Sequence, residues 1–292
     1  MTRILKLLLR DRVALVSALY LVCIVVACGL AALFLVQEAA AMKFGSGRLA
    51  PFDFARPVRD WLGTDQLGRS VLYMLLVAGA TSLSIAICAA IIAAATGTVL
   101  GIAAGYFGGI VDTLAMRLAD VILSFPSLLL AILFVYLFEP SATNIIILLV
   151  ISRVPLYLRI SRAETLEISR RLFVDASRML GASNLRICRR DILPMVMPNV
   201  LTLVALDIGL LMLIESALSF LGIGIQPPST SWGLMVASGR ELMGTAWWLT
   251  FFPGLAISLT AVASSFLSNW VRIAADPAQR WRLELGQGSE GR

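Results

Sequence analysis

The residues that could do chemistry in this sequence are two acids inside a long apolar run. Asp207 and Glu215 both lie between residues 197 and 222. On a helix they would be about 12 Å apart along the axis and about 80° apart around it, so they could share one broad face. An acid near the centre of a bilayer costs about 2.5–3.5 kcal/mol, and it normally faces protein. We predict a role in a translocation pathway, in gating or in helix pairing. The structural alternative is an internal ion pair, for example with Arg153.

Other reactive residues are scarce. The chain has no histidine, which excludes a histidine metal site and a histidine general base. Neither of the two lysines, Lys6 and Lys43, follows the glycine-rich sequence of a phosphate-binding loop. The four cysteines form no CxxC motif, and we interpret them as reduced packing residues. We therefore predict no catalytic residue, no metal site and no cofactor in this chain.

The composition indicates the elements that must position the two acids. Hydrophobic residues make up 59% of the 292 residues and charged residues 14%, against about 25% charged in a soluble domain. These proportions exclude a cytosolic enzyme, a secreted disulfide scaffold and a disordered chain. A spanning helix needs about 20 apolar residues, and the alternation of a membrane barrel is missing. We predict an all-α, polytopic membrane protein with six transmembrane helices, at residues 13–36, 75–104, 117–138, 144–160, 197–222 and 247–271.

The ends of the chain can be placed from charge. The first apolar run follows a basic start and includes Val25-Val26-Ala27-Cys28, which loosely resembles a lipoprotein cleavage site. Because the run continues to Val36, we expect a retained anchor. With both termini inside, 17 basic residues lie on the cytoplasmic side and 6 outside. We therefore predict cytoplasmic termini, a first helix within 1–36, a periplasmic segment at 37–74, a membrane domain at 75–275 and a cytoplasmic tail at 276–292.

The longest cytoplasmic segment is predicted at about residues 160–196. Leu172, Ala176 and Met179 recur at helical spacing. Gly181 can end this helix and Ser183 can cap the next one. Such a helix–glycine–helix hairpin would suit docking of a partner, and it would equally suit a helix lying on lipid headgroups. The arginines of this segment are compatible with both.

Two further patterns concern packing and the membrane surface. Gly97, Gly101, Gly105 and Gly109 form a ladder that lets helices approach closely, with a hinge as the alternative. Tryptophan favours membrane interfaces, and we expect an outer aromatic belt that consists of Trp232, Trp247 and Trp248.

The segment at 37–74 is rich in glycine, proline and mixed charge. We predict that Trp61, Asp65 and Arg69 contact a partner protein. A structural cap on the first two spans is the equal alternative.

At the long cytoplasmic segment the sequence resembles a known family. The stretches Phe173–Ser177, Leu180–Ser183 and Ile192–Pro194 are similar to the EAA loop of the permeases of ABC importers. Asp175 takes the place of the glutamate and Ser177 that of the second alanine, while Ala176 and Gly181 match. Residues 62–69 (LGTDQLGR), 105–109, 125–127, 219–228 and 253–257 resemble the dipeptide, oligopeptide and nickel branch, in particular its C-type permease.

The resemblance implies a five-helix permease core with an N-terminal outer helix, in the bacterial inner membrane. It implies a heterodimer with a homologous second permease, a periplasmic or lipid-anchored binding protein, and no nucleic acid. Two partner ATPases would bind ATP and Mg and leave this chain non-catalytic. They would dock on a set of eight residues: Asp175, Ala176, Ser177, Gly181, Ala182, Ser183, Leu193 and Pro194.

The substrate and the class of protein stay open at this stage. The implied substrate is a di- or oligopeptide, with a nickel chelate, an opine or a glutathione-like peptide as alternatives. The rival classes are a stand-alone secondary transporter or channel, which would show an inverted repeat, and a non-transporting scaffold.

Overall fold

The computed structural model describes residues 8–9, 11–43 and 45–275. Within this part the chain is helical, and the only extended pairing is an isolated bridge between Thr64 and Ser70. The long helices are α2 (Arg12–Phe34), α4 (Val71–Phe107), α7 (Ala142–Ile168), α10 (Leu193–Phe220) and α12 (Trp248–Ala275). The shorter ones are α3 (Val36–Ala40), α5 (Gly109–Ser124), α6 (Ser127–Leu137), α8 (Leu172–Met179), α9 (Asn184–Ile187) and α11 (Trp232–Gly239).

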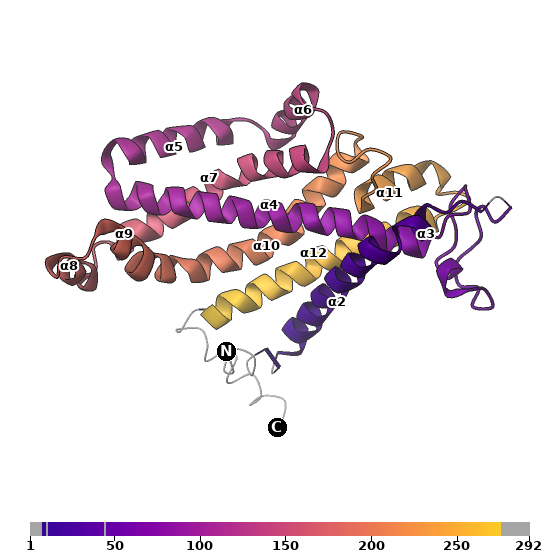
Figure 1. Ribbon diagram of the computed structural model, residues 1–292, viewed down its shortest axis with the longest axis horizontal. Helices are drawn as coiled ribbons and strands as arrows, with labels where there is room; N and C mark the ends of the chain where they lie inside the picture. The colour runs from indigo at the N-terminus through magenta and orange to yellow at the C-terminus, as the bar shows by residue number, and fades with distance from the viewer. Residues whose placement is uncertain (1–7, 10, 44, 276–292) are drawn as a thin grey trace.

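Five of the described helices are long and apolar enough to cross a membrane, where six spans were predicted. They cover residues 12–34, 71–107, 142–168, 184–220 and 248–274. The expected span at 117–138 is instead divided into α5 and α6 at Phe125-Pro126, and Phe125 is extended. Proline disfavours helical backbone in the residue before it and has no N–H to continue the ladder. In Figure 1, α6 accordingly turns away from the line of α5.

The central contact of the bundle joins α4 to α7 through the glycine ladder. A Cβ added at Gly97 would lie 2.5 Å from Tyr157 Cβ, and one at Gly101 would lie 2.6 Å from the Leu158 carbonyl oxygen. A Cβ on Gly105 would lie 2.8 Å from the Arg162 carbonyl oxygen and 2.8 Å from Thr165 Cβ. The packing interpretation is therefore confirmed for these three glycines. It is wrong for Gly109, which begins α5 at φ +56° with open space around it.

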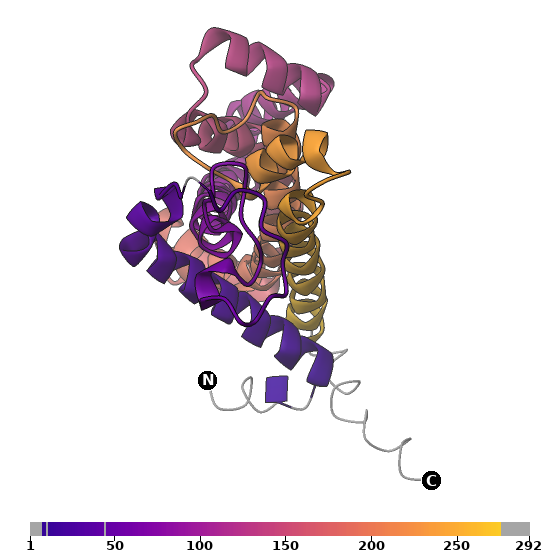
Figure 2. The same cartoon turned by 90° about the vertical axis from the view of Figure 1, so that its right-hand side faces the viewer.

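The other helices surround this pair. On one side α5 is fastened to α7 by ion pairs of Arg159 with Asp120 and of Arg162 with Asp112. On the other side α10 packs on α12, where a Cβ on Gly209 would lie 2.9 Å from Ser264 Cβ. Helix α2 lies outside this core along one side of the bundle, as Figure 2 shows. This arrangement has the expected form of a permease core with an outer N-terminal helix.

The two ends of the bundle carry different structures (Figure 1). At one end α8 and α9 protrude beyond the ends of α4 and α10. At the opposite end residues 41–43 and 45–70 form an irregular cap, which lies near α3 and α11. We refer to residues 172–187 as the hairpin and to residues 41–43 and 45–70 as the cap.

Candidate functional site: a protruding hairpin and a capped cavity

The hairpin has the predicted helix–glycine–helix form. Helix α8 ends at Met179, and Gly181 follows with φ +79°, in the left-handed region where a Cβ is disfavoured. The Ser183 hydroxyl then accepts a hydrogen bond from the Arg186 N–H and caps α9. The predicted roles of Gly181 as a stop and Ser183 as a cap are confirmed.

The inner side of the hairpin is firmly seated on the bundle. Val174 and Ile187 are fully buried, in one cluster with Ile168, Ile192 and Val196. The Tyr106 hydroxyl at the end of α4 donates to Asn184 Oδ1 at 3.0 Å. The hairpin therefore packs directly against side chains of α4, α7 and α10.

The outer side of the hairpin is apolar and uncovered. Four large side chains are almost fully exposed in this chain: Leu172 (87%), Met179 (88%), Leu180 (88%) and Leu185 (78%). Exposed apolar side chains grouped at one tip are typical of a protein or membrane contact.

Asp175 does not act as the N-cap of helix α8. The N-cap of α8 is Arg171, which makes no side-chain cap, and Asp175 pairs with Arg178 at 3.0 Å. Contact with the Tyr106 hydroxyl, followed by the Asp175 carboxylate, raises the pKa of Arg178. Asp175 thus braces the outer face of the hairpin.

The chain after the hairpin continues without a break. Leu193 and Pro194 form the start of α10, and a π turn at Cys188–Ile192 joins α9 to it. Neither Pro194 nor Pro198 interrupts the helix. Proline in the first turn of a helix loses no hydrogen bond, and Pro198 is accommodated within α10. The remaining predicted docking residues, Ala176, Ser177 and Ala182, lie within the hairpin and its turn.

The two acids of α10 have separate surroundings. Asp207 is buried and pairs with Arg153 Nη2 of α7 at 2.7 Å, which confirms the ion-pair alternative for this residue. Glu215 is fully buried and accepts hydrogen bonds from Ser219 Oγ at 2.8 Å and Ser216 Oγ at 3.4 Å. Asp207 joins α10 to α7, whereas these two hydrogen bonds of Glu215 stay within α10. Neither acid lines the cavity described below. Their role in a pathway or in gating stays a prediction.

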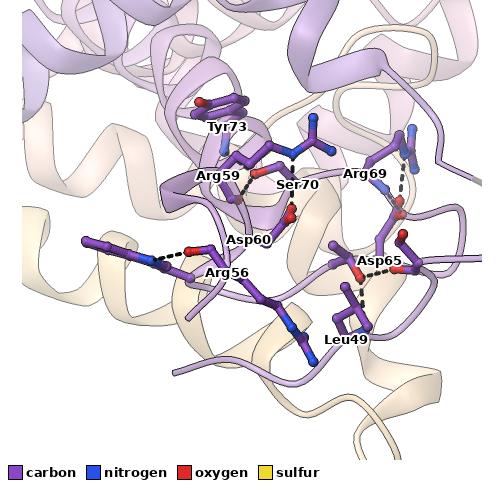
Figure 3. A network of polar contacts seen from close by, with 11 residues as sticks. Leu49, Arg56, Arg59, Asp60, Asp65, Arg69, Ser70 and Tyr73 are labelled. Carbon is purple, nitrogen blue, oxygen red and sulfur yellow. Dashed lines mark hydrogen bonds and ion pairs between the residues drawn. The ribbon is translucent and has the colours of Figure 1, made fainter. Parts of the chain in front are cut away.

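The cap is organised by the LGTDQLGR segment (Figure 3). Asp65 Oδ1 accepts the N–H groups of Leu67 and Arg69 at 2.9 and 2.8 Å, and Oδ2 accepts Arg69 Nε at 2.6 Å. Thr64 Oγ1 donates to the Ser46 carbonyl and accepts the Leu49 N–H. These bonds support the alternative of a structural cap for Asp65.

Two positions of the cap require glycine. Gly63 and Gly68 have φ of +84° and +75°. A Cβ on Gly68 would lie 2.1 Å from the Lys43 carbonyl oxygen. Trp61 is partly exposed and donates Nε1 to the Arg56 carbonyl at 3.1 Å. Its contact with a partner stays a prediction.

The cap forms part of the wall of an open cavity of about 850 Å³ at this end of the bundle. Its walls come from α3, the cap, α4, the loop at 227–230 and α11, together with Leu242 and Leu249. Among the residues that the structure describes, only Asp65 and Arg69 are charged in its lining. The sequence did not reveal this cavity, because its walls are far apart along the chain.

Two of the three tryptophans predicted for a membrane belt are buried at the cap end instead. Trp232 is fully buried and donates Nε1 to the Leu75 carbonyl at 2.8 Å. Trp248 is buried and donates Nε1 to the Thr64 carbonyl at 3.2 Å. The prediction of an outer belt is wrong for these two, since a buried indole N–H needs a partner. Trp247 is exposed.

A bundle of spanning helices with a seated hairpin at one end and a capped cavity at the other defines a membrane permease. The family model for "Binding-protein-dependent transport system inner membrane component" matches residues 97–281, and the chain belongs to this family. It is therefore a multi-pass permease component of an ABC importer in the inner membrane.

Curated relatives extend the similarity to most of the chain. The probable D,D-dipeptide transport system permease protein DdpC of Escherichia coli (strain K12) is 36% identical over 74% of this chain and 73% of its own length. The di/tripeptide transport system permease protein DppC of Pseudomonas aeruginosa (strain UCBPP-PA14) is 36% identical over 78% and 81%. The glutathione transport system permease protein GsiD of Pectobacterium atrosepticum is 34% identical over 87% of each chain.

A solved structure shares the fold. A chain of the MetNI methionine ABC transporter, in an inward-facing conformation, superposes with a TM-score of 0.53 at 15% identity. The match covers 70% of this chain and 97% of the other.

Proposed function

We propose that this chain forms one half of a peptide pathway across the inner membrane, together with a homologous second permease. A periplasmic or lipid-anchored binding protein delivers the peptide at the cap end. Two ATPase subunits, which bind ATP and Mg²⁺, dock on the hairpin and supply the energy. Relatives described as dipeptide, di/tripeptide and glutathione permeases support a short peptide as the substrate.

The observation that carries this proposal is the two-sided hairpin. Its outer side offers Leu172, Met179, Leu180 and Leu185 to a partner, while its inner side is seated by Val174 and Ile187. A subunit that binds this tip differently in two states shifts the equilibrium between the two arrangements of the helices. The chain thus converts the movement of a partner into movement of its own spans and needs no catalytic residue.

The orientation of the chain follows from the same assignment. Docking of the ATPases requires the hairpin to be cytoplasmic, and the 17 basic residues of the cytoplasmic side favour this. We infer that both termini are cytoplasmic as well and that the cap is periplasmic.

Replacement of Gly181 tests the coupling. Gly181→Val places a β-branched side chain at φ +79°, which L residues other than asparagine and aspartate rarely adopt. We expect peptide import and peptide-stimulated ATP hydrolysis to fall at least tenfold. Gly181→Asn is the matched control, because asparagine tolerates this backbone region and the surrounding space is open.

The measurements separate coupling from insertion and folding. Membrane insertion and ATPase co-purification are followed in a tagged chain isolated from its native membrane, and import is measured in the same strains. Unchanged peptide import by the Gly181→Val chain would contradict the coupling role of the hairpin. A wild-type chain that purifies folded and without ATPases would favour the rival stand-alone transporter.

A further inference from the structure

The cap cavity has the character of a small-molecule site. Its volume of about 850 Å³ lies within the range of about 300–1,000 Å³ of ligand pockets. Most of its lining is apolar, including Val36, Met74, Val77 and Met235. The polar groups are few, and apart from one ion pair they are neutral: Gln66, Thr81, Ser229, Thr230 and Ser238.

The ion pair leaves one edge of a guanidinium unused. Arg69 engages Asp65 through Nε alone, at 2.6 Å. Within the part of the chain that the structure describes, neither Nη nitrogen of Arg69 has a protein partner. Four of the five N–H donors of this side chain are therefore free, and its side chain is 32% exposed, against 10% for Asp65.

Asp65 directs Arg69 and has little capacity left for a ligand. Its Oδ1 accepts two backbone N–H groups and its Oδ2 accepts Arg69 Nε. The carboxylate is thus turned toward the loop, while Gly68 holds the backbone between Asp65 and Arg69 against Lys43. Because the guanidinium is fixed at one nitrogen, less freedom is lost when its other donors bind a ligand.

The free edge of Arg69 selects for one kind of ligand group. A pair of parallel N–H donors on a planar fork matches the two oxygens of a carboxylate. A ligand ammonium would find only the occupied Asp65, since no other acid of the described part of the chain lines the cavity. The apolar walls and neutral hydroxyl groups then suit the uncharged remainder of a small molecule.

We propose that Arg69 anchors a carboxylate in the cap cavity, and that this carboxylate is the C-terminus of a short peptide. The identity of the ligand rests on the proposed function, whereas the anion site rests on the cavity and on Arg69 alone. The cap is then more than a structural cover: its LGTDQLGR segment builds the side chain that receives the substrate.

Protection of an introduced thiol tests this directly. Ser229 lies in the cavity lining and is exposed, so Ser229→Cys reports access to the cavity by its rate of reaction with a membrane-impermeant maleimide. The transporter is isolated through a tag on this full chain, and the probes are trialanine and trialanine amide. They have nearly the same size and differ in the carboxylate. We expect trialanine to slow labelling and the amide to do so at least tenfold less effectively.

Variants of Arg69 assign the effect to its guanidinium. In the Ser229→Cys background, Arg69→Gln should weaken protection by trialanine about tenfold or more, because a charged hydrogen-bonding partner is lost. Arg69→Lys keeps the charge without the fork and should give an intermediate loss. Arg56→Gln is the matched control, since Arg56 belongs to the cap, pairs with Asp53 and does not line the cavity.

The outcomes separate the anchor from the proposed function. Equal protection by both probes, no protection by either, or full protection in the Arg69→Gln chain would each overturn the anchor. If the labelling rate without peptide is the same as in the parent chain, the Arg69 variants keep the cap folded. If Arg69→Gln changes this rate, the protection measured with Arg69→Lys decides whether the guanidinium anchors the carboxylate. Import of trialanine by cells is measured separately. Arg69-dependent protection without any peptide import would overturn the peptide function and leave the anion site standing.

Discussion

At the scale of single residues, the two acids of α10 illustrate how differently a bundle can accommodate a buried charge. Asp207 has Arg153 as a counter-ion from a neighbouring helix, and Glu215 has serine hydroxyl groups. The sequence predicted that both would face protein, because lipid is too costly a surrounding for a carboxylate. It named Arg153 as a possible partner, but the pair with Asp207 forms only once α7 packs on α10. Ser216 and Ser219, in contrast, lie within four residues of Glu215 on the same helix.

The Arg153–Asp207 pair leads to a prediction about stability. Asp207→Leu leaves the half-buried Arg153 without its partner, and we expect it to lower the free energy of unfolding by about 3–5 kcal/mol. The double variant Arg153→Met/Asp207→Leu removes both charges and should recover most of this loss. Unfolding by SDS in mixed micelles measures all three chains against the wild type. A double variant as unstable as the single one would show that the pair itself is not what matters.

At the scale of elements, sequence patterns succeeded where the physical cause is local. Gly181 and Ser183 end and start helices through their own backbone and side chain, so the hairpin was predictable. The division of a span at Phe125-Pro126 is also local, but the apolar composition concealed it. The burial of Trp232 was not predictable, because its hydrogen-bond partners Leu75 and Ser82 are about 150 residues away along the chain.

The contact between α4 and α7 provides a prediction at this scale. Gly101→Ala would place a methyl group 2.6 Å from a backbone carbonyl, which cannot move without shifting α7. We expect a loss of about 1–3 kcal/mol. Gly29→Ala is the control, since Gly29 lies in α2 with nothing within 4 Å of an added Cβ, and there alanine should be neutral or stabilising by up to about 1 kcal/mol. The thermal unfolding midpoints of both chains in one detergent measure the difference, and equal midpoints would contradict close helix contact.

At the scale of the whole molecule, the bundle separates two surfaces that must act together. The hairpin and the cap lie at opposite ends (Figure 1), and α4 and α10 extend between these ends. Helix α4 begins beside the cap and ends at Phe107, and Tyr106 in its last turn contacts Asn184 of the hairpin. A rigid helix of this kind can carry a displacement from one end to the other. The cavity itself could not be predicted, because it exists only after α3, α4 and α11 come together.

This separation leads to a prediction about the two faces of the membrane. Ala55 lies in an exposed turn of the cap, and Leu185 lies at the exposed tip of the hairpin. In spheroplasts we expect an impermeant maleimide to label the Ala55→Cys chain at once and the Leu185→Cys chain only after the membrane is permeabilised. The parent chain supplies the background of the four native cysteines, of which Cys188 is part of the hairpin end. The reverse pattern would place the hairpin outside, where no ATPase could reach it, and coupling through Gly181 would then have no physical basis.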